Sequence, residues 1–454
     1  MKRFSIFLLD TLLLYGALLL TLFLRYPGRF SAQYGYHDVP FFIIFGIWLL
    51  VFYIANLYNV REFRNTIHFY TLLFRAISIA SVIALSFFYL IPYFGIAPKT
   101  NLAIFIAISS ALLLLHRWLF NKVIETKFRK PTLIVGLNNQ SLELARFINS
   151  HPSLGYLVKT IVDVSKENLK VMPISQESFR IVSGSDGLEQ IIEEEGITTV
   201  VIGPEAYPMP RVIEIFYRSL GKKISFYNLA EFYERLTGRV PLGGISQIWF
   251  LENLTEGSKR LYEISKRIID IIWASILGIF SLILLPFIAL VIRLDSPGPI
   301  FYRQTRVGQK GKIFSMLKYR TMVKDAEVKT GAVWAKDNDT RVTSVGRFLR
   351  KTRLDEIPQI WNIFKGDMSL VGPRAERPEF RDVLKNEVPF YEERYLIKPG
   401  LTGWAQINFR YGSSVKDTAE KLQYDLYYIK NRSLILDLGI VLQTIRIVLQ
   451  QSGK

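Results

Sequence analysis

Long apolar runs dominate the beginning of the chain. Four windows with few charges each contain about 18 to 23 residues: 4–24, 41–58, 73–95 and 102–120. A helix needs about 20 such residues to cross ~30 Å of hydrocarbon. The pattern therefore predicts a block of four transmembrane helices within residues 1–125. The first run is longer than a signal-peptide core and no small-residue cleavage site follows it, so we expect it to remain as a membrane helix.

Basic residues give these helices a direction. Lys2 and Arg3 precede the first run and Lys122 and Lys127 follow the fourth, whereas the loop at 92–100 carries little charge. Segments rich in Lys and Arg stay on the cytoplasmic side of a bilayer. We therefore expect both ends of the block to face the cytoplasm, in a multi-pass protein of the inner membrane.

From residue 131 the pattern changes to short β-branched runs that alternate with amphipathic segments. The runs at 132–136, 160–164, 198–203 and 223–228 read as buried strands, and the segments at 141–149 and 210–220 as crossover helices. This alternation predicts a small doubly wound, Rossmann-like α/β domain over 131–246. Its first turn, GLNNQS at 136–141, keeps one glycine where a dinucleotide fingerprint has three. A structural or regulatory module is therefore favoured, with Asp163 as the candidate ribose contact if a nucleotide binds.

A fifth apolar run covers 271–294, after a linker at 247–265. Basic residues flank it on both sides, among them Arg267 and Arg293, so both ends favour the cytoplasm. A simple crossing satisfies only one of them. Pro286 removes a backbone donor and tends to kink a helix. The run is predicted either to span the bilayer or to dip into one leaflet and return, with Pro286 as the hinge of such a re-entrant helix.

Composition narrows the chemistry. The 454 residues carry a formal charge of +18 and include no cysteine, so disulfides, thiolate catalysis and cysteine-ligated zinc are excluded. Residues 293–353 hold fifteen basic and five acidic side chains, which is +10 of that charge. Such a concentration predicts a polyanion nearby, either anionic lipid head groups or a phosphorylated substrate. No nucleic-acid recognition motif is present, so nucleic acid is not expected as a partner.

Two adjacent carboxylates, Asp355 and Glu356, lie in RKTRLDEIPQIWN at 350–362, directly after Arg353. A carboxylate among arginines is expected to keep a depressed pKa and to attack a phosphorus atom that the same cations have partly neutralised. The second carboxylate could hold Mg²⁺ against phosphate oxygens. An acid pair beside arginine is also typical of a surface salt bridge or a helix cap. By itself the pair leaves both interpretations open.

Several long motifs identify the last part of the chain more specifically. KRIIDII (266–272), RLDSPGPIFYRQTRVGQKGKIFSMLKYRTM (293–322), RVTSVGRFLRKTRLDEIPQIWNIFKGDMSLVGPRAERPEF (341–380) and IKPGLTGWAQINFR (397–410) occur in this order. This region resembles the bacterial sugar transferase family, the polyprenyl-phosphate hexose-1-phosphate transferases. Four membrane helices and a degenerate Rossmann-like module ahead of it resemble the long-form members, so the likeness covers nearly the whole chain.

The resemblance implies a fold and a reaction. Members have a re-entrant helix broken near a proline and a mainly helical cytoplasmic catalytic domain, here 266–454. They transfer a sugar 1-phosphate from a nucleotide sugar, usually a UDP-sugar, to undecaprenyl phosphate in the bilayer and release UMP. Such transfer begins the synthesis of exopolysaccharide, capsule or O-antigen. On this chain Asp355 would be the nucleophile that forms a phosphosugar intermediate, Glu356 the Mg²⁺ ligand and Arg374 a phosphate ligand. Relatives often have proline at Ala375 and glycine at Phe409, which alters the turn beside Arg374 and the nucleotide pocket beside Arg410.

Further substrate contacts are expected in the same domain. Lys318 and Arg320 alternate as in a strand and are candidates for diphosphate contacts, with solvated strand charges as the alternative; Arg353 is a third. Gln406 could read the uracil or the sugar, and Asp425 could assist deprotonation of the acceptor phosphate. A C-terminal amphipathic helix at 434–450 is expected to lie in the membrane interface, with a subunit contact as the alternative. A homodimer formed through the α/β module is also a possibility that the sequence leaves open.

Two other functions stay open. A catalytically silent scaffold of polysaccharide assembly would use the same membrane elements without turnover. A membrane-anchored nucleotide-sugar dehydratase or epimerase also joins such helices to Rossmann modules, but it requires an intact GxGxxG and a Tyr-x-x-x-Lys pair. The first of these motifs is absent.

Overall fold

The chain folds into two compact units, Met1–Phe232 and Tyr233–Lys454. The computed structural model describes residues 2–63, 65–91, 99–127, 129–164, 170–172, 178–184, 187–254, 259–324, 326, 339–409 and 414–449. Most of the loop between the third and fourth apolar runs and the candidate residue Arg410 lie outside these ranges.

The first unit begins with four long helices, α1 (Lys2–Arg25), α2 (Phe30–Ile54), α3 (Ile67–Leu90) and α4 (Lys99–Lys127). Each is long and apolar enough to cross a membrane, which confirms the expectation of several apolar helices at this end. Their shared core is rich in aromatic rings, including Phe41, Trp48 and Phe105. Buried Arg117 of α4 donates to buried Asp10 of α1 over 2.6 Å, so the two charges compensate each other inside the block.

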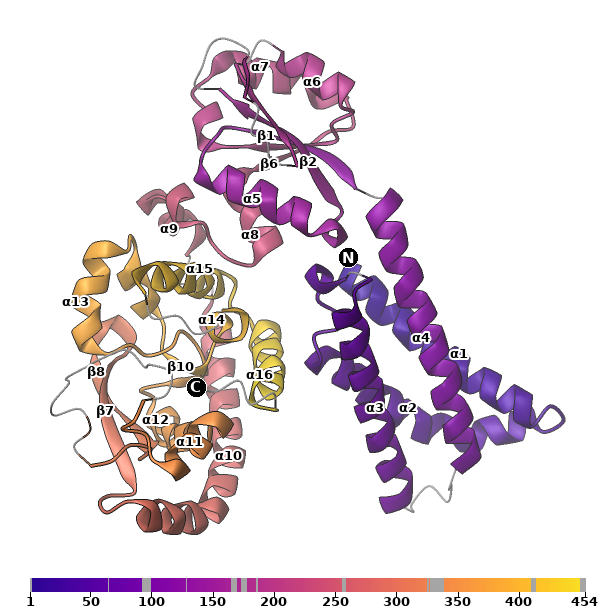
Figure 1. Ribbon diagram of the computed structural model, residues 1–454, viewed down its shortest axis with the longest axis vertical. Coiled ribbons are helices and arrows are strands. Elements are labelled where there is room, and N and C mark those ends of the chain that lie inside the picture. The colour runs from indigo at the N-terminus through magenta and orange to yellow at the C-terminus, as the bar shows by residue number, and fades with distance from the viewer. Residues whose placement is uncertain are drawn as a thin grey trace. The chain divides into compact units, whose positions relative to one another are not determined.

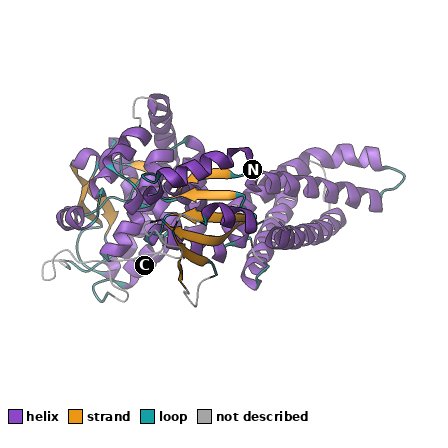
Figure 2. Cartoon of the chain, turned by 90° about the horizontal axis from the view of Figure 1, so that it is seen from above, coloured by secondary structure: helices purple, strands orange, loops and turns teal. Residues whose placement is uncertain are grey.

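The rest of this unit is an α/β module. Its strands are β1 (Lys130–Val135), β2 (Tyr156–Asp163), β3 (Lys170–Met172), β4 (Arg180–Ser183), β5 (Thr199–Ile202) and β6 (Ser225–Asn228), in the order β3-β4-β2-β1-β5-β6. All neighbours are parallel except β3 with β4. The strands lie side by side (Figure 2), and Figure 1 places α5 (Asn139–Ser150) on one side and α6 (Leu188–Glu194) and α7 (Pro210–Arg218) on the other. The predicted parallel α/β sheet is confirmed.

Alternating side chains of the strands reach opposite faces of this sheet. Leu133 and Val135 of β1 join Val212 and Phe216 of α7 in one buried cluster. Ile134, between them in the chain, is fully buried but belongs to the other face. Burial on both faces explains why these strands read as continuous apolar runs.

The carboxyl edge of the sheet holds an acidic side chain where a nucleotide phosphate would be expected. Asn138, the N-cap of α5, donates to Glu205 Oε1 over 2.8 Å. A Cβ on Gly136 would lie 2.7 Å from Glu205 Oε2, so the carboxylate lies directly over this turn. Dinucleotide folds bind phosphate at this helix N-terminus. A carboxylate there disfavours phosphate, which supports a structural or regulatory role for the module.

The second unit contains the remaining elements. Its helices are the end of α8 (Leu229–Thr237), α9 (Gln247–Asn253), α10 (Arg260–Asp295), α11 (Ser344–Thr352), α12 (Ile360–Lys365), α13 (Pro378–Glu387), α14 (Trp404–Asn408), α15 (Val415–Asn431) and α16 (Leu434–Leu449). Two small sheets complete it: an antiparallel hairpin of β7 (Phe301–Val307) and β8 (Ile313–Tyr319), and the parallel pair β9 (Ser369–Val371) and β10 (Gly400–Thr402). One buried cluster joins Val240, Met316, Ile363, Tyr391 and Leu426 from across this unit.

Helix α10 contains the fifth apolar run, with Pro286 inside it. Figure 1 shows the helix running down one side of the unit and then turning to run across its lower end. Much of its apolar surface is exposed, for example Ile279, Phe280 and Phe287. The helix is the fifth in the described chain that is long and apolar enough to cross a membrane. Its outer surface therefore needs an apolar environment.

The first turns of α10 are fixed to the rest of the unit by buried polar contacts. Arg267 donates to the carbonyls of Ile363 and Phe364 over 2.6 and 2.8 Å and so caps the last turn of α12. Buried Asp270 accepts from the amide of Leu370 in β9 over 3.0 Å. The first turns of α10 are thus joined by hydrogen bonds to α12 and β9 inside the unit.

Helix α16 has two different faces. Gly439 and Ile440 are buried against the unit, while Ile435, Leu438 and Leu449 are exposed. Buried Asp437 near its start accepts from Lys266 of α10 and from Tyr428 of α15, over 2.8 and 2.6 Å. One face of α16 therefore packs against the rest of the unit, and the other face is apolar and exposed.

Candidate active site

The acid pair lies at a sharp change of backbone direction. Helix α11 ends at Thr352, and Arg353 adopts a left-handed conformation with φ 61° and ψ 13°. A 3₁₀ segment, Leu354–Gln359, follows at once, and its first turn carries Asp355 and Glu356. Both carboxylates are buried. A non-glycine residue with positive φ is uncommon and is often found at functional sites.

Glu356 binds the cations of the site. Lys318 Nζ and Arg374 Nη2 lie 3.0 and 2.7 Å from its Oε1 atom, and Arg353 Nη1 lies 3.8 Å from Oε2. Burial alone would raise the pKa of Glu356, but these three cations outweigh burial and hold its pKa well below the ordinary value. Glu356 is therefore ionised throughout the physiological range.

Asp355 lies in different surroundings. Its Oδ1 atom is buried and has no hydrogen-bond partner among the residues that the structure describes. Burial, followed by the negative charge of Glu356, raises the pKa of Asp355 to about 6. The expectation of a depressed pKa for this residue is therefore wrong. The cations that the sequence concentrates here are oriented toward Glu356, so they compensate burial of Asp355 only in part.

Asn362 holds the acid pair against the strand that carries Lys318. Its Nδ2 atom donates to Ser315 O over 2.8 Å, and its Oδ1 atom accepts from Leu317 N over 3.0 Å. The amide side chain thus pairs with β8 as a neighbouring strand would. Glu356 and Lys318 are brought together by this contact although 38 positions separate them in the chain.

Arg374 reaches the site from a loop locked by close backbone packing. The loop follows β9, where Gly372 N donates to Thr402 O and Gly400 N donates to Pro373 O, both over 2.9 Å. A Cβ on Gly400 would lie 2.1 Å from Gly372 N. The glycines of the PGLTG motif therefore permit this approach of two chains, and they contact the loop that carries Arg374.

Asp425 supports Arg374 indirectly. It is buried and forms a 2.9 Å ion pair with Arg394, and Arg394 donates in turn to the backbone carbonyl of Arg374 over 3.1 Å. Tyr391 accepts from the same guanidinium over 3.0 Å. This arrangement makes Asp425 a positioning residue for the loop.

Two other candidate residues contact the surrounding backbone. Arg320 donates to the carbonyls of Ser296 and Pro297, over 2.6 and 3.2 Å, and so fixes the turn after α10. Gln406 donates to Leu401 O over 3.2 Å, and its Oε1 atom is buried without a partner in the described structure. Pro286 lies inside α10.

One basic residue that the sequence did not single out lies beside the pair. Arg306 of β7 is partly buried, and its guanidinium donates to the neutral oxygens Gln304 Oε1 and Ala375 O. Burial, followed by the charge of Arg374, lowers its pKa to about 10. A partly buried guanidinium close to another cation favours an anion from outside. Arg306 lies within the strongly basic stretch from Arg303 to Lys312, and the sequence gave no sign of which arginine of that stretch points inward.

The donor set of the pair is of the kind that Mg²⁺ uses. Among the described residues no group of three or more His, Cys, Asp or Glu side chains could form a complete protein cage for a metal ion. Mg²⁺ is commonly held by one or two carboxylates together with substrate phosphates and water. The Oε2 atom of Glu356, whose nearest cation, Arg353 Nη1, is 3.8 Å away, fits that requirement.

Comparison with known proteins places this geometry in a family. The family model for bacterial sugar transferases matches residues 261–451, which include all the residues of the site. A putative undecaprenyl-phosphate N-acetylgalactosaminyl 1-phosphate transferase of Bacillus subtilis (strain 168) is 49% identical over 144 residues, covering 31% of this chain and 78% of that protein.

Two further relatives extend the comparison. The UDP-N-acetylgalactosamine-undecaprenyl-phosphate N-acetylgalactosaminephosphotransferase of Aeromonas hydrophila is 42% identical over 231 residues, 51% of this chain and 53% of that protein, so this chain spans about half of its length. The galactosyl transferase CpsE of Streptococcus agalactiae serotype III (strain NEM316) is 29% identical over 476 residues, covering 98% of this chain and all of that protein. The resemblance seen in the motifs is confirmed, and this chain belongs to the bacterial sugar transferase family.

Proposed function

We propose that this protein transfers a hexose 1-phosphate from a UDP-sugar to undecaprenyl phosphate. The reaction releases UMP and gives a hexose linked to undecaprenyl diphosphate. This would be the first step in building an exopolysaccharide, capsule or O-antigen. The relatives from Aeromonas and Bacillus are named for transfers of this kind. The observation that carries the proposal is the unequal acid pair, in which Glu356 is bound by cations and Asp355 presents a buried, unpartnered oxygen.

In the first step, a carboxylate oxygen of Asp355 attacks the phosphorus that bears the sugar. The bond from that phosphorus to the oxygen of the UMP group breaks, and UMP leaves with the electron pair. The product is an aspartyl-phosphosugar. Lys318 and Arg374, beside Glu356, would neutralise the diphosphate oxygens as negative charge develops on them. Arg306 would add a third cation at the same place.

In the second step, a phosphate oxygen of undecaprenyl phosphate attacks the same phosphorus. The bond between that phosphorus and the Asp355 oxygen breaks, which regenerates the carboxylate and forms the new diphosphate. The pKa of Asp355, about 6, is compatible with both steps. The side chain is an ionised nucleophile at neutral pH in the first step, and it leaves as a carboxylate in the second.

Mg²⁺ is the cofactor we propose, with Glu356 Oε2 as its protein ligand. When bound it would supply positive charge that stabilises the phosphate oxygens of the donor. The positions of Lys318 and Arg374 are fixed by Glu356 independently of any ion.

The membrane elements give the reaction a location. We propose that α1–α4 span the inner membrane, that α10 enters the cytoplasmic leaflet and returns at a hinge near Pro286, and that α16 lies in the interface with its open apolar face toward lipid. The bent course of α10 and its exposed apolar residues support this (Figure 1). The strand order of the α/β module supports the likeness to Rossmann folds.

The test uses purified full-length protein in lipid nanodiscs with Mg²⁺, undecaprenyl phosphate and a panel of radiolabelled UDP-sugars. We expect one UDP-sugar to give labelled lipid and UMP. Without acceptor, UMP release should stop after about one equivalent per active site, and the label should remain on the protein. Asp355→Asn should abolish both products, while Asp382→Asn, the same change at an exposed site on α13, should leave both unchanged.

Two results would contradict the proposal. Turnover at the wild-type rate by Asp355→Asn would remove Asp355 as the nucleophile. Failure of the wild-type protein to make labelled lipid from any UDP-sugar would favour a silent scaffold, whereas conversion of the UDP-sugar without UMP release would favour a dehydratase or epimerase.

A further inference from the structure

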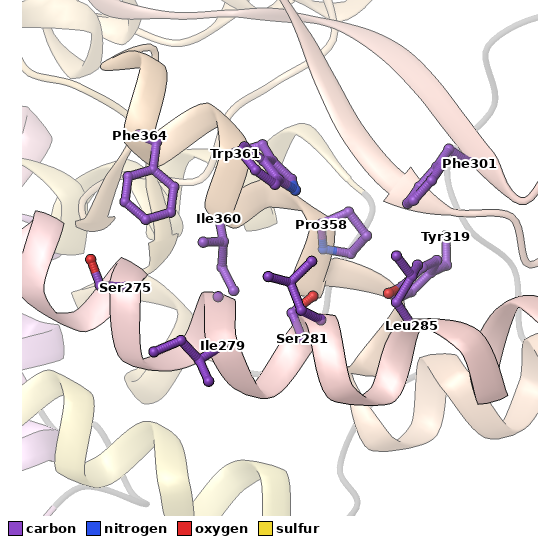
Figure 3. Close-up of a pocket in the computed structure, with 12 residues that line it drawn as sticks. Ser275, Ile279, Ser281, Leu285, Phe301, Tyr319, Pro358, Ile360, Trp361 and Phe364 are labelled. Carbon is purple, nitrogen blue, oxygen red and sulfur yellow. The ribbon is translucent and has the colours of Figure 1, made fainter.

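An apolar cavity of about 350 Å³ lies between α10 and the segment that follows the acid pair. One wall is formed by α10 and contains Ile279 and Leu285, and the opposite wall contains Pro358 and Trp361 (Figure 3). Gly278 of α10 also lines the cavity. Phe301 and Tyr319 of the β7–β8 hairpin close one end. The lining is almost entirely aliphatic and aromatic, so the cavity suits a hydrocarbon and not a nucleotide or a sugar.

The cavity and the acid pair are built on the same two pieces of backbone. Pro358 comes three residues after Asp355 in the same 3₁₀ segment. In β8, Lys318 pairs with Glu356, while the next residue, Tyr319, lines the cavity. Successive side chains of a strand point to opposite faces. A charged site for phosphate and an apolar site are therefore separated by the thickness of one strand and one turn.

The cavity borders the surface that we place in hydrocarbon. Ile276, Phe280 and Ile283, beside the cavity on α10, are all more than half exposed, and so is Trp361 in the opposite wall. A hydrophobic chain could pass from the bilayer into the cavity without crossing water. A ligand that joins a phosphate directly to a long apolar chain matches this arrangement, in which the charged site is followed by the apolar cavity and then by the exposed apolar surface of α10.

We infer that this cavity binds the part of the polyprenyl chain next to the phosphate of the acceptor lipid. The inference rests on the proposed function, because it assumes that the acceptor phosphate is delivered to Asp355. Holding the chain here would orient the acceptor phosphate toward the phosphosugar and restrict its motion, which accelerates the second step. An acyl chain of an ordinary phospholipid is the alternative occupant.

Gly278 provides the sharpest test, because its missing side chain keeps the cavity open. A Cβ at this position would lie 3.6 Å from the ring of Phe364, an ordinary contact, so Gly278→Ala should be tolerated. A leucine there would fill the cavity. We expect Gly278→Leu to raise KM for undecaprenyl phosphate at least tenfold and to leave the acceptor-free burst of UMP unchanged. Ile283→Phe, which adds bulk to an exposed position of the same helix, is the matched control and should change neither.

The two measurements separate this inference from the proposed function. The UMP burst depends on Asp355 and the donor alone, so its absence in the wild-type protein would refute the proposed function. An unchanged acceptor KM in Gly278→Leu would refute the cavity assignment. Equal loss of the burst and of acceptor use would also refute it, because the substitution would then act through the acid pair.

Photo-crosslinking of the wild-type protein tests the same inference without any substitution. A polyprenyl phosphate with a diazirine on its first isoprene units should label residues 275–285 or 358–364, and excess undecaprenyl phosphate should prevent this. Labelling elsewhere would overturn the assignment. So would equal labelling of these residues by a diazirine phosphatidylethanolamine that undecaprenyl phosphate does not displace.

Discussion

Asp355 and Glu356 are neighbours in the chain, yet the closest cations bind only Glu356. Lys318 and Arg374 both contact Glu356 Oε1, while Asp355 Oδ1 is buried and unpartnered within the described structure. The pKa of Glu356 is held low and that of Asp355 is raised to about 6. Two carboxylates whose surroundings separate their pKa values in this way are suited to different tasks. This separation leads to the first two predictions.

Formation of the phosphosugar should decline as the pH falls through about 6. Asp355 attacks as a carboxylate, and protonation below its raised pKa of about 6 removes the nucleophile. The measurement is single-turnover UMP release between about pH 5 and 8 without acceptor, because a phosphomonoester acceptor also titrates near pH 6. Circular dichroism at each pH checks that the fold persists. A rate that stays flat down to pH 5 would be inconsistent with Asp355 as the attacking group.

Glu356→Gln should move this pH dependence to lower pH and reduce the plateau rate. The substitution removes the like charge that contributes to the raised pKa of Asp355, and leaves Lys318 and Arg353 to act on Asp355. The same cations lose the partner that positions them, so the rate should fall. Glu387→Gln, at an exposed position of α13, is the control. A shift toward higher pH would mean that Glu356 does not raise the pKa of its neighbour.

Arg306→Gln should weaken binding of the UDP-sugar. We expect KM for the donor to rise at least tenfold, or about 1.4 kcal/mol, because a guanidinium that we place beside the donor diphosphate is lost. Arg303→Gln, on an exposed position of the same strand, should have little effect. Steady-state kinetics with saturating acceptor measures both variants. Equal effects of the two substitutions would indicate a general loss of positive charge rather than a specific contact.

Arg353→Gly should be more stable than Arg353→Ala, although both should be less active than the wild-type protein. Both variants lose the guanidinium near Glu356, but only glycine adopts the left-handed conformation without steric cost. The difference should be about 1 kcal/mol, or roughly 2–4 °C in Tm. Thermal unfolding in detergent measures the stability and UMP release measures the activity. Identical Tm values would show that the left-handed turn is not maintained in the variants.

Much of the architecture could be predicted from the sequence because it depends on local pattern. Long apolar windows indicated α1–α4, and β-branched runs indicated β1, β2, β5 and β6. Strands β3 and β4 were missed, since Lys170–Met172 is only three residues long and charged Arg180 interrupts the apolar run around β4. The course of α10 was left open between two alternatives, because the flanking charges and Pro286 do not specify a direction in space.

The sequence predicted which residues form the site better than it predicted their charge interactions. The motifs located the acid pair, Lys318 and Arg374, but which carboxylate receives the cations depends on contacts across 38 and 18 positions of chain. Asp425 was expected near the acceptor, whereas its ion pair with Arg394 makes it a support for the Arg374 loop. Such contacts are fixed by tertiary packing, and local spacing does not contain them.

The caps at the base of α10 have a practical consequence. Arg267 caps α12, and Asp270 accepts from the backbone of β9. This helix therefore supplies polar partners to the two segments that lie between the acid pair and Arg374 in the chain. Deleting the helix to obtain a detergent-free enzyme would orphan those carbonyl and amide groups. Solubility is better sought by replacing the outward-facing isoleucines and phenylalanines while keeping the helix itself.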